Sequence, residues 1–394
     1  CLQITAKCTI IVSRLTHNSG QHQLKKRKIR SKKPTCFMLL PSLALLGGLI
    51  ALVWSADKFV AGSAAAAKHL GMSPVMIGLT IVALGTSAPE ILVSAEAALN
   101  GAPGLGIGNA IGSNIANIGL VLGITAMFAT IPIAECLLRR ELPLLLIVTA
   151  ACGAALWDHY LSFIEGLLLF SATFVIIGGL VFGARRRAKQ VARGELAAIA
   201  QDTASATADN PCVDDFDRTH ELAADVPEMS TRRSWVYLTV GLLILLASAD
   251  LLVWSATEMA TYFGVKPLII GLTVVALGTS LPELAASVTS ALKGHHDIAV
   301  GNIMGSNILN ILAVMSLPGL IAPTDLTIAV LHRDYSAMVW LTLLLTFVIC
   351  LQIYRRHRHR GEEAFSGGIS KGWGFLFLCG YAAYYVSIFA TAQH

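Results

Sequence analysis

Long apolar stretches separated by short polar segments dominate the chain. A helix that crosses a membrane needs about 20 mostly apolar residues, and ten stretches of this kind can be marked. We therefore predict an all-α, polytopic membrane protein. Its ten transmembrane helices are expected at residues 38–66, 74–99, 104–130, 142–157, 161–184, 235–262, 267–292, 298–321, 335–354 and 372–391.

One long polar segment, residues 185–234, interrupts this pattern. Its middle, residues 202–228, contains eight acidic residues and one arginine, with too few large apolar residues to bury a core. We interpret the segment as a linker. A calcium-sensing role for Asp214, Asp215 and Asp217 is less favoured, because the spacing of an EF-hand loop, with its glycine and final glutamate, is absent.

The basic residues of the short loops predict the orientation, since cytoplasmic loops are enriched in Lys and Arg. If the linker is cytoplasmic, nearly all of these residues lie inside, and only Lys266 and Arg333 lie outside. The expected organisation is therefore a first five-helix unit at residues 38–184, a cytoplasmic linker at 185–234 and a second five-helix unit at 235–394.

Composition and charge support a membrane protein and exclude other classes. Hydrophobic residues make up 55% and charged residues 13% of the chain, whereas soluble proteins have about 25% charged residues. The net charge of +5 is local, because residues 1–37 hold nine of the 29 basic residues and no acidic one. We therefore predict no nucleic-acid partner, and we expect residues 1–37 to be a non-native or disordered extension. The eight scattered cysteines predict neither a disulfide framework nor a zinc site.

A segment of 44 residues occurs twice. Residues 74–117 recur without a gap at residues 267–310, with about 24 identical positions. Each copy lies in a unit of five predicted helices, and because five is odd, the second unit enters the membrane in the opposite sense. The sequence therefore predicts two inverted-topology five-helix repeats, an organisation that transporters use with a site between the copies near the midplane.

Both copies place a carboxylate inside a predicted span, where an ionisable residue indicates function. Glu90 lies about two thirds along the second span, and Glu283 occupies the same place in the seventh, which runs the other way. Both carboxylates should come near the bilayer centre. Hydroxyl groups share their face of the helix at positions i−4 and i−3, namely those of Thr86, Thr279, Ser87 and Ser280.

Pro89 and Pro282 precede these glutamates and should kink the helix and release main-chain carbonyls. The candidate carbonyl ligands are those of Gly85, Gly278 and their neighbours, including Ala83, Thr86, Ala276 and Thr279. A site of carboxylates, hydroxyls and carbonyls suits hard cations such as calcium and sodium, and it lacks the soft ligands of zinc or copper.

The next span of each copy adds polar residues along one face, at positions i, i+4 and i+8. Glycine pairs on the same spans, Gly108 with Gly112 and Gly301 with Gly305, should allow close helix approach. Asn114 and Asn307 are interpreted as interhelical hydrogen-bond partners in preference to ligands. The polar face consists of Asn109, Ser113 and Asn117 in the first copy and Asn302, Ser306 and Asn310 in the second.

These motifs, GTSxPE and GNxxGSNxxN in both copies, resemble the calcium/cation antiporter superfamily, and specifically its bacterial calcium/sodium antiporter branch, which is related to the sodium/calcium exchangers. The resemblance extends from Met38 to the end of the chain. It implies ion ligands at Glu90, Glu283, Thr86, Thr279, Ser87, Ser280, Ser113, Ser306 and Asn117, with main-chain oxygens of Ala83 and Ala276. Asn310 occupies a further matching position, where archaeal and potassium-dependent members of that family typically have Asp.

The resemblance also implies alternating access, in which the first and sixth spans slide across the other eight. We expect an antiporter that exchanges sodium for calcium across the inner membrane of a bacterium, electrogenic, active as a monomer in the lipid bilayer and without a cofactor. A proton-coupled calcium or cation antiporter is the alternative, because it would use the same carboxylates. An intramembrane hydrolase is disfavoured, since HExxH is absent and no His lies centrally in a span.

Overall fold

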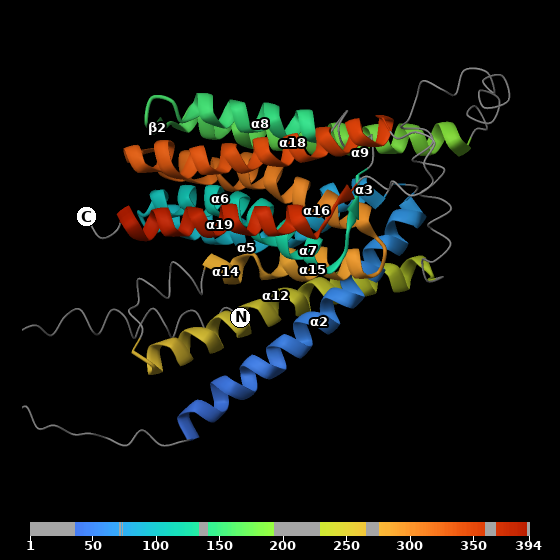
Figure 1. The fold of residues 1–394 in the computed structure, drawn as a ribbon, viewed down its shortest axis with the longest axis horizontal. Coiled ribbons are helices and arrows are strands. Elements are labelled where there is room, and N and C mark those ends of the chain that lie inside the picture. Colours follow the sequence, from blue (N-terminus) through green and yellow to red (C-terminus); the bar gives the residue numbers. More distant parts are fainter. Residues whose placement is uncertain are drawn as a thin grey trace, which may run out of the picture. The chain divides into compact units, whose positions relative to one another are not determined.

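Helices account for nearly all of the described chain in the computed structural model (Figure 1). The structure describes residues 36–70, 72, 74–133, 141–192, 229–264, 276–358 and 368–391. The chain divides into residues 1–39, described only from Cys36, and residues 40–394. Most of the predicted extension and of the linker, including Asp214, Asp215 and Asp217, lies outside the described residues.

The first half of the chain contains α2 and the helices up to α9, with π-helical segments marked η. The elements are α2 (Cys36–Leu70), α3 (Pro74–Ile77), η1 (Gly78–Val82), α4 (Ala83–Thr86), α5 (Ala88–Leu99), α6 (Pro103–Ala116), η2 (Asn117–Leu122), α7 (Gly123–Phe128), β1 (Ile131–Pro132), α8 (Leu142–Ala155), β2 (Tyr160–Leu161) and α9 (Phe163–Ala192).

The second half runs from α12 to α19. Its elements are α12 (Thr231–Tyr262), α14 (Ala276–Thr279), α15 (Leu281–Leu292), α16 (His296–Leu309), η7 (Asn310–Val314), α17 (Ser316–Ile321), β3 (Thr324–Asp325), η8 (Val330–Tyr335), α18 (Ser336–Arg358), β4 (Gly368–Ile369) and α19 (Lys371–Thr391). The strands form two short antiparallel ladders, β1 with β4 and β2 with β3, which the sequence did not predict.

Seven helices of the described chain are long and apolar enough to cross a membrane. A bent pair, residues 75–86 with 88–99 at 44°, would make an eighth, and α8 is a shorter apolar helix. Residues 267–275 of the predicted seventh span lie outside the described residues. A mostly helical, polytopic membrane protein is therefore confirmed, whereas the number ten and the inverted repeat remain predictions.

Repeated sequence produces repeated local structure at the ends of α5 and α15. Gly101 and Gly294 stand at matching positions, with positive φ angles of 74° and 79°. At the first, Gly101 N–H donates to Ala98 O and Ala102 N–H donates to Ala97 O. The same pattern closes α15 at Gly294. Both helices therefore end in a Schellman motif, which explains why glycine is required there.

The third span of each copy forms the centre of the bundle. In the most apolar window of His296–Ile321, 94% of residues are buried, against 11% for Lys371–Ala390. The segments α3 and η1 pack against α16, and glycine makes this possible, because a Cβ at Gly301 would lie 2.5 Å from Val75 O of α3 and 3.1 Å from Leu79 N of η1. Side chains at such positions would force the helices apart.

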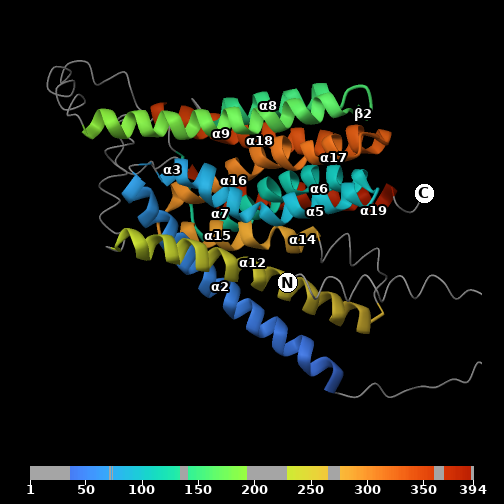
Figure 2. The ribbon, with the colours of Figure 1, turned by 180° about the vertical axis from the view of Figure 1, so that it is seen from behind.

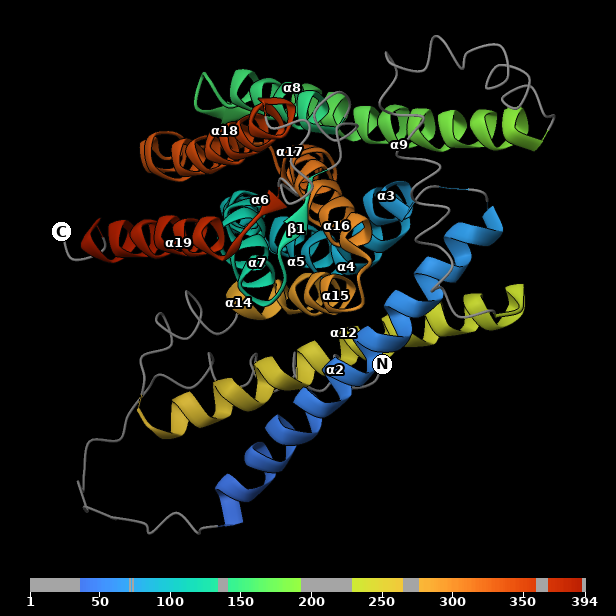
Figure 3. The ribbon, with the colours of Figure 1, turned by 45° about the vertical axis from the view of Figure 1, so that its right-hand side comes forward.

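Two flanks enclose this centre. Helices α8, α9 and α18 lie on one side, and residues 40–70 of α2 lie with α12 on the other (Figures 1 and 2). In Figure 3, α2 and α12 cross one another. Their backbones come close at two glycines, since a Cβ at Gly241 would lie 2.6 Å from Phe59 N, and one at Gly62 would meet Leu238 N.

Candidate ion-binding site

The helix that carries each central glutamate is interrupted one turn before it. Ser87 separates α4 from α5, and Ser280 separates α14 from α15. Both serines have ψ near 0°, so the main chain leaves helical geometry there. The prolines that follow lie in the first turn of the next helix, where a missing N–H is tolerated. The break predicted from the prolines therefore falls at the serines.

As a result, Glu90 and Glu283 lie in the first turn of α5 and α15. Each is 1% exposed, and Ser87, three residues before Glu90, has its hydroxyl 3.3 Å from Glu283 Oε1. The positive end of a helix dipole favours a carboxylate at this position. The helix dipole cannot compensate a buried negative charge completely, so the two carboxylates require a nearby positive charge.

Most of the other predicted ligands are also buried. Thr279 is partly exposed, and Ala276 is the first residue of α14. The buried members are Ala83, Thr86, Ser87, Ser113, Asn117, Ser280, Ser306 and Asn310.

Three of these side chains meet across the two sequence copies. The hydroxyl of Ser87, from the first copy, lies 3.3 Å from Glu283 Oε1 and 3.1 Å from Ser306 Oγ, both from the second. The structure thus brings together the helix break of one copy, the carboxylate of the other and the polar face of the other copy's third span.

The remaining candidates enter from the elements around this contact. Ser113 lies in α6, which packs against α14 and η7. Ser306 lies in α16, which packs against α4 and η2. Asn117 and Asn310 are the first residues of the π-helical segments η2 and η7. A π-helical turn often marks a functional site, and here it occurs at the same position of both copies.

Several buried polar atoms have no hydrogen-bond partner within the described residues. They include one oxygen of each central carboxylate, both side-chain polar atoms of Asn117 and Asn310, and the hydroxyl oxygen of Ser280. Buried polar groups of folded proteins nearly always have a partner. A hard cation is a suitable partner for such oxygens, and no group of three His, Cys, Asp or Glu that could hold a metal gathers in the described chain. Apart from the two carboxylates, the oxygens named here are neutral.

Asn302 is the polar residue whose role sequence reasoning missed. It lies on the polar face that the sequence predicted for α16, and its amide contacts protein groups. Nδ2 donates to Ser287 Oγ at 3.0 Å, and Oδ1 accepts from Thr86 Oγ1 at 3.1 Å. The contacts span both copies, and a single sequence carries no signal of such pairing.

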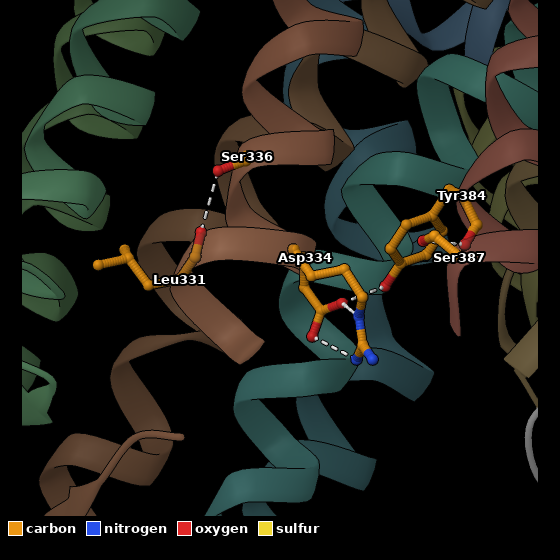
Figure 4. Close-up of polar contacts among 6 residues, drawn as sticks. Leu331, Asp334, Ser336, Tyr384 and Ser387 are labelled. Carbon is orange, nitrogen blue, oxygen red and sulfur yellow. Dashed lines mark hydrogen bonds and ion pairs between the residues drawn. The ribbon is translucent and has the colours of Figure 1, made fainter. Parts of the chain in front are cut away.

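Asp334 is a further buried carboxylate, and no sequence motif pointed to it. It is 8% exposed, and Arg333 donates to its two oxygens at 2.7 and 3.1 Å. The hydroxyl of Tyr384 adds a bond of 3.2 Å (Figure 4). Its charge is compensated by protein groups, which distinguishes it from Glu90 and Glu283.

The contacts test the expectation for Asn114 and Asn307, and they also show an ion pair of Asp57. Asn114 donates to Met338 Sδ on α18, as expected of an interhelical partner, whereas Asn307 donates to Ile303 O of its own helix. Asp57 of α2 forms an ion pair of 2.5 Å with Lys293, which caps α15. That pair ties α2 to the helix that carries Glu283.

Comparison with known proteins identifies the family. The model of the sodium/calcium exchanger protein family matches residues 41–182 and 233–390. The chain belongs to the sodium/calcium exchanger family. The resemblance seen in the repeated motifs is therefore confirmed, and the protein is a cation antiporter of the membrane, not an enzyme.

Individual relatives cover most of the chain. It is 42% identical over 308 residues to CaxA of Alkalimonas amylolytica, whose name refers to antiport, covering 78% of this chain and 89% of that protein. It is 36% identical over 340 residues to the inner membrane protein YrbG of Escherichia coli K12, covering 86% and 95%. A structure of the sodium-calcium exchanger NCX_Mj, soaked without Na⁺ and Ca²⁺, matches with a TM-score of 0.67 and 29% identity over 89% of this chain and 99% of that one.

Proposed function

We propose that the protein exchanges sodium for calcium across the inner membrane of a bacterium by alternating access. The observation that carries this proposal is the pair of buried carboxylates next to hydroxyls from both sequence copies. One oxygen of each carboxylate has no hydrogen-bond partner among the described residues. The transported ions would be bound by Glu90 and Glu283 with the other candidates. These are Thr86, Thr279, Ser87, Ser280, Ser113, Ser306, Asn117 and Asn310, with main-chain oxygens of Ala83 and Ala276.

The charge of the site supplies the reason for obligatory exchange. An empty site holds two negative charges in a poorly hydrated place, which is costly. One calcium ion or several sodium ions would neutralise them. The protein can therefore switch the side of the membrane to which the site is open only when the site holds ions. After releasing one kind of ion, it must bind the other kind before it can switch back.

The proposed membrane topology has ten spans in two inverted five-helix repeats, residues 38–184 and 235–394. A cytoplasmic linker at 185–234 joins the repeats. Both copies place a helix break, a carboxylate and a π-helical turn in the same order. One polypeptide contributes both halves of the site, so we expect a monomer to suffice for transport and no cofactor to be needed.

The test is uptake of calcium-45 into proteoliposomes that contain the purified protein. We expect an outward sodium gradient to drive uptake and a proton gradient without sodium to have no such effect. Equal uptake under the proton gradient would overturn the sodium assignment and favour a proton-coupled cation antiporter, which would use the same carboxylates.

A further inference from the structure

We propose that Asn302 and Asn109 are positioning residues that hold the two ion-binding carboxylates by their main chains, and that Asn302 also couples one carboxylate to the opposite repeat. The inference rests on the proposed function of the site. It concerns two asparagines that lie on the ligand face of their helices but contact main-chain and hydroxyl groups of the protein.

The same bond occurs in both copies. Asn109 Nδ2 donates to Glu90 O at 3.1 Å, and Asn302 Nδ2 donates to Glu283 O at 3.5 Å. In each case the asparagine stands 19 residues after the glutamate, on the next helix. Each carbonyl belongs to the first turn of α5 or α15, directly after the helix break. The amide therefore fixes the segment that determines where the carboxylate points.

Asn302, in the second copy, makes more hydrogen bonds than Asn109, its counterpart in the first copy. Asn302 is fully buried, while Asn109 is partly exposed. Besides its bond to Glu283 O, the amide nitrogen donates to Ser287 Oγ at 3.0 Å, also in α15. Its Oδ1 accepts from Thr86 Oγ1 at 3.1 Å, in α4 of the first copy.

These contacts use both ends of the Asn302 amide. The two N–H groups of a primary amide are both donors, and only the oxygen can bind a cation. The oxygen accepts from the Thr86 hydroxyl and the nitrogen donates to α15, so protein groups hold the amide at both ends, and we assign Asn302 a role that acts through these neighbours. It links α15, which carries Glu283, to α4, which ends at the helix break of the first copy. A shift of either helix on ion binding is therefore transmitted to the other through the Asn302 side chain.

The experiment measures calcium binding and exchange in Asn302→Ala, Asn109→Ala and Ser287→Ala. Asn307→Ala is the matched control, because Asn307 is a buried asparagine of the same helix whose amide nitrogen donates only within that helix. We expect Asn302→Ala to raise the calcium concentration for half-maximal exchange about tenfold, a loss of about 1.4 kcal/mol. Asn109→Ala and Ser287→Ala should raise it less, and Asn307→Ala by under about twofold.

A role in structure alone would give a different result. It would lower the melting temperature and the yield of folded protein, but the folded fraction would keep the calcium dependence of the wild type. We therefore also record the rise in melting temperature that calcium causes in detergent, since a ligand stabilises the state that binds it in proportion to occupancy. An Asn302→Ala protein with wild-type half-saturation and a wild-type calcium shift overturns the proposal.

Two safeguards keep the outcome interpretable. If Asn302→Ala does not fold, Ser287→Ala and Asn109→Ala decide, and unchanged half-saturation in both contradicts the inference. If calcium neither stabilises the wild-type protein nor is transported by it, the proposed function fails. If the wild type binds calcium and Asn302→Ala binds it equally well, the proposed function stands and only the inference about Asn302 fails.

Discussion

Glu90 and Glu283 are 1% exposed within the span region, and each has a carboxylate oxygen without a protein partner in the described chain. Asp334 is buried nearly as deeply, yet Arg333 and Tyr384 occupy its oxygens. A buried carboxylate that is already paired needs no ion, whereas an unpaired one does. This contrast separates Asp334 from the two central glutamates.

We expect Glu90→Gln and Glu283→Gln each to abolish calcium exchange while the protein still folds. Either change leaves a divalent ion half-neutralised in a poorly hydrated site, but it preserves the size of the side chain. Calcium-45 exchange in proteoliposomes and a melting curve in detergent measure both effects. Glu96→Gln is the matched control, since Glu96 lies on the same helix as Glu90 but is exposed. Near-normal exchange in either site variant would refute the site.

Asn310 carries a prediction about potassium. The resemblance to calcium/cation antiporters implies that archaeal and potassium-dependent members typically have Asp at the matching position, where a third carboxylate could help to hold an additional monovalent cation. Asn310 is buried and neutral, as is its counterpart Asn117. We expect sodium-dependent calcium exchange to continue at an unchanged rate when potassium is replaced by choline on both sides. Exchange that stops without potassium would contradict this interpretation of Asn310.

The repeated motifs predicted which residues to examine, but not how they meet. A single sequence shows which positions share a helix face, and it placed Asn302 on the ligand face. The face argument assumes a regular helix, whereas Asn117 and Asn310 each begin a π-helical segment. The bond between Thr86 and Asn302 joins residues 216 positions apart, and hydrophobic periodicity carries no information about such pairs.

At the scale of elements, hydropathy predicted the helices well because apolar length is a strong signal. Local geometry was harder to predict. The helix breaks fall at Ser87 and Ser280, because a proline fits the first turn of a new helix as easily as it kinks an old one. The two-residue strands β1 to β4 were missed, since they are too short to show an alternating pattern.

The close packing of α16 on η1 predicts the effect of a single methyl group. A Cβ at Gly305 would lie 2.6 Å from Leu79 O and 2.7 Å from Ala83 Cβ, and main-chain atoms cannot move aside cheaply. We expect Gly305→Ala to lower the free energy of unfolding by about 1–3 kcal/mol and to reduce exchange. A melting curve in detergent and calcium flux measure the two effects.

Gly178→Ala is the control for this change. Gly178 is an exposed position of α9 with nothing within 4 Å of an added Cβ. Alanine there should be neutral or stabilise the helix by about 0.5–1 kcal/mol, because glycine is the poorer helix former. A Gly305→Ala protein as stable as the control would show that the helices separate more easily than the packing indicates.

At the scale of the whole molecule, the sequence repeat predicted more than any single motif. It indicated that the two carboxylates belong to one site, and the contacts of Ser87 with Glu283 and Ser306 join the two copies as that prediction requires. The number of spans could not be settled in the same way. Residues 267–275 lie outside the described residues, and α8 has only 14 residues, so length and composition alone count seven or eight.

The charge of the site predicts how exchange responds to voltage. With Asn117 and Asn310 neutral, the formal negative charges among the proposed side-chain ligands are those of Glu90 and Glu283, and one calcium ion balances them. If three sodium ions bind instead, as the resemblance to sodium/calcium exchangers implies, the loaded site carries one net positive charge. The cycle would then move one positive charge in the direction of sodium.

One charge that crosses the full field couples by about 2.3 kcal/mol per 100 mV, which is about a 50-fold change in the equilibrium. An inside-negative potential should therefore favour sodium entry and calcium exit, and an inside-positive potential should favour calcium entry. Calcium-45 flux in vesicles clamped by valinomycin and potassium gradients of opposite sign measures this, with Glu283→Gln vesicles as the background. Exchange that is independent of voltage would mean that both loaded forms carry the same charge, and that two sodium ions, not three, replace each calcium ion.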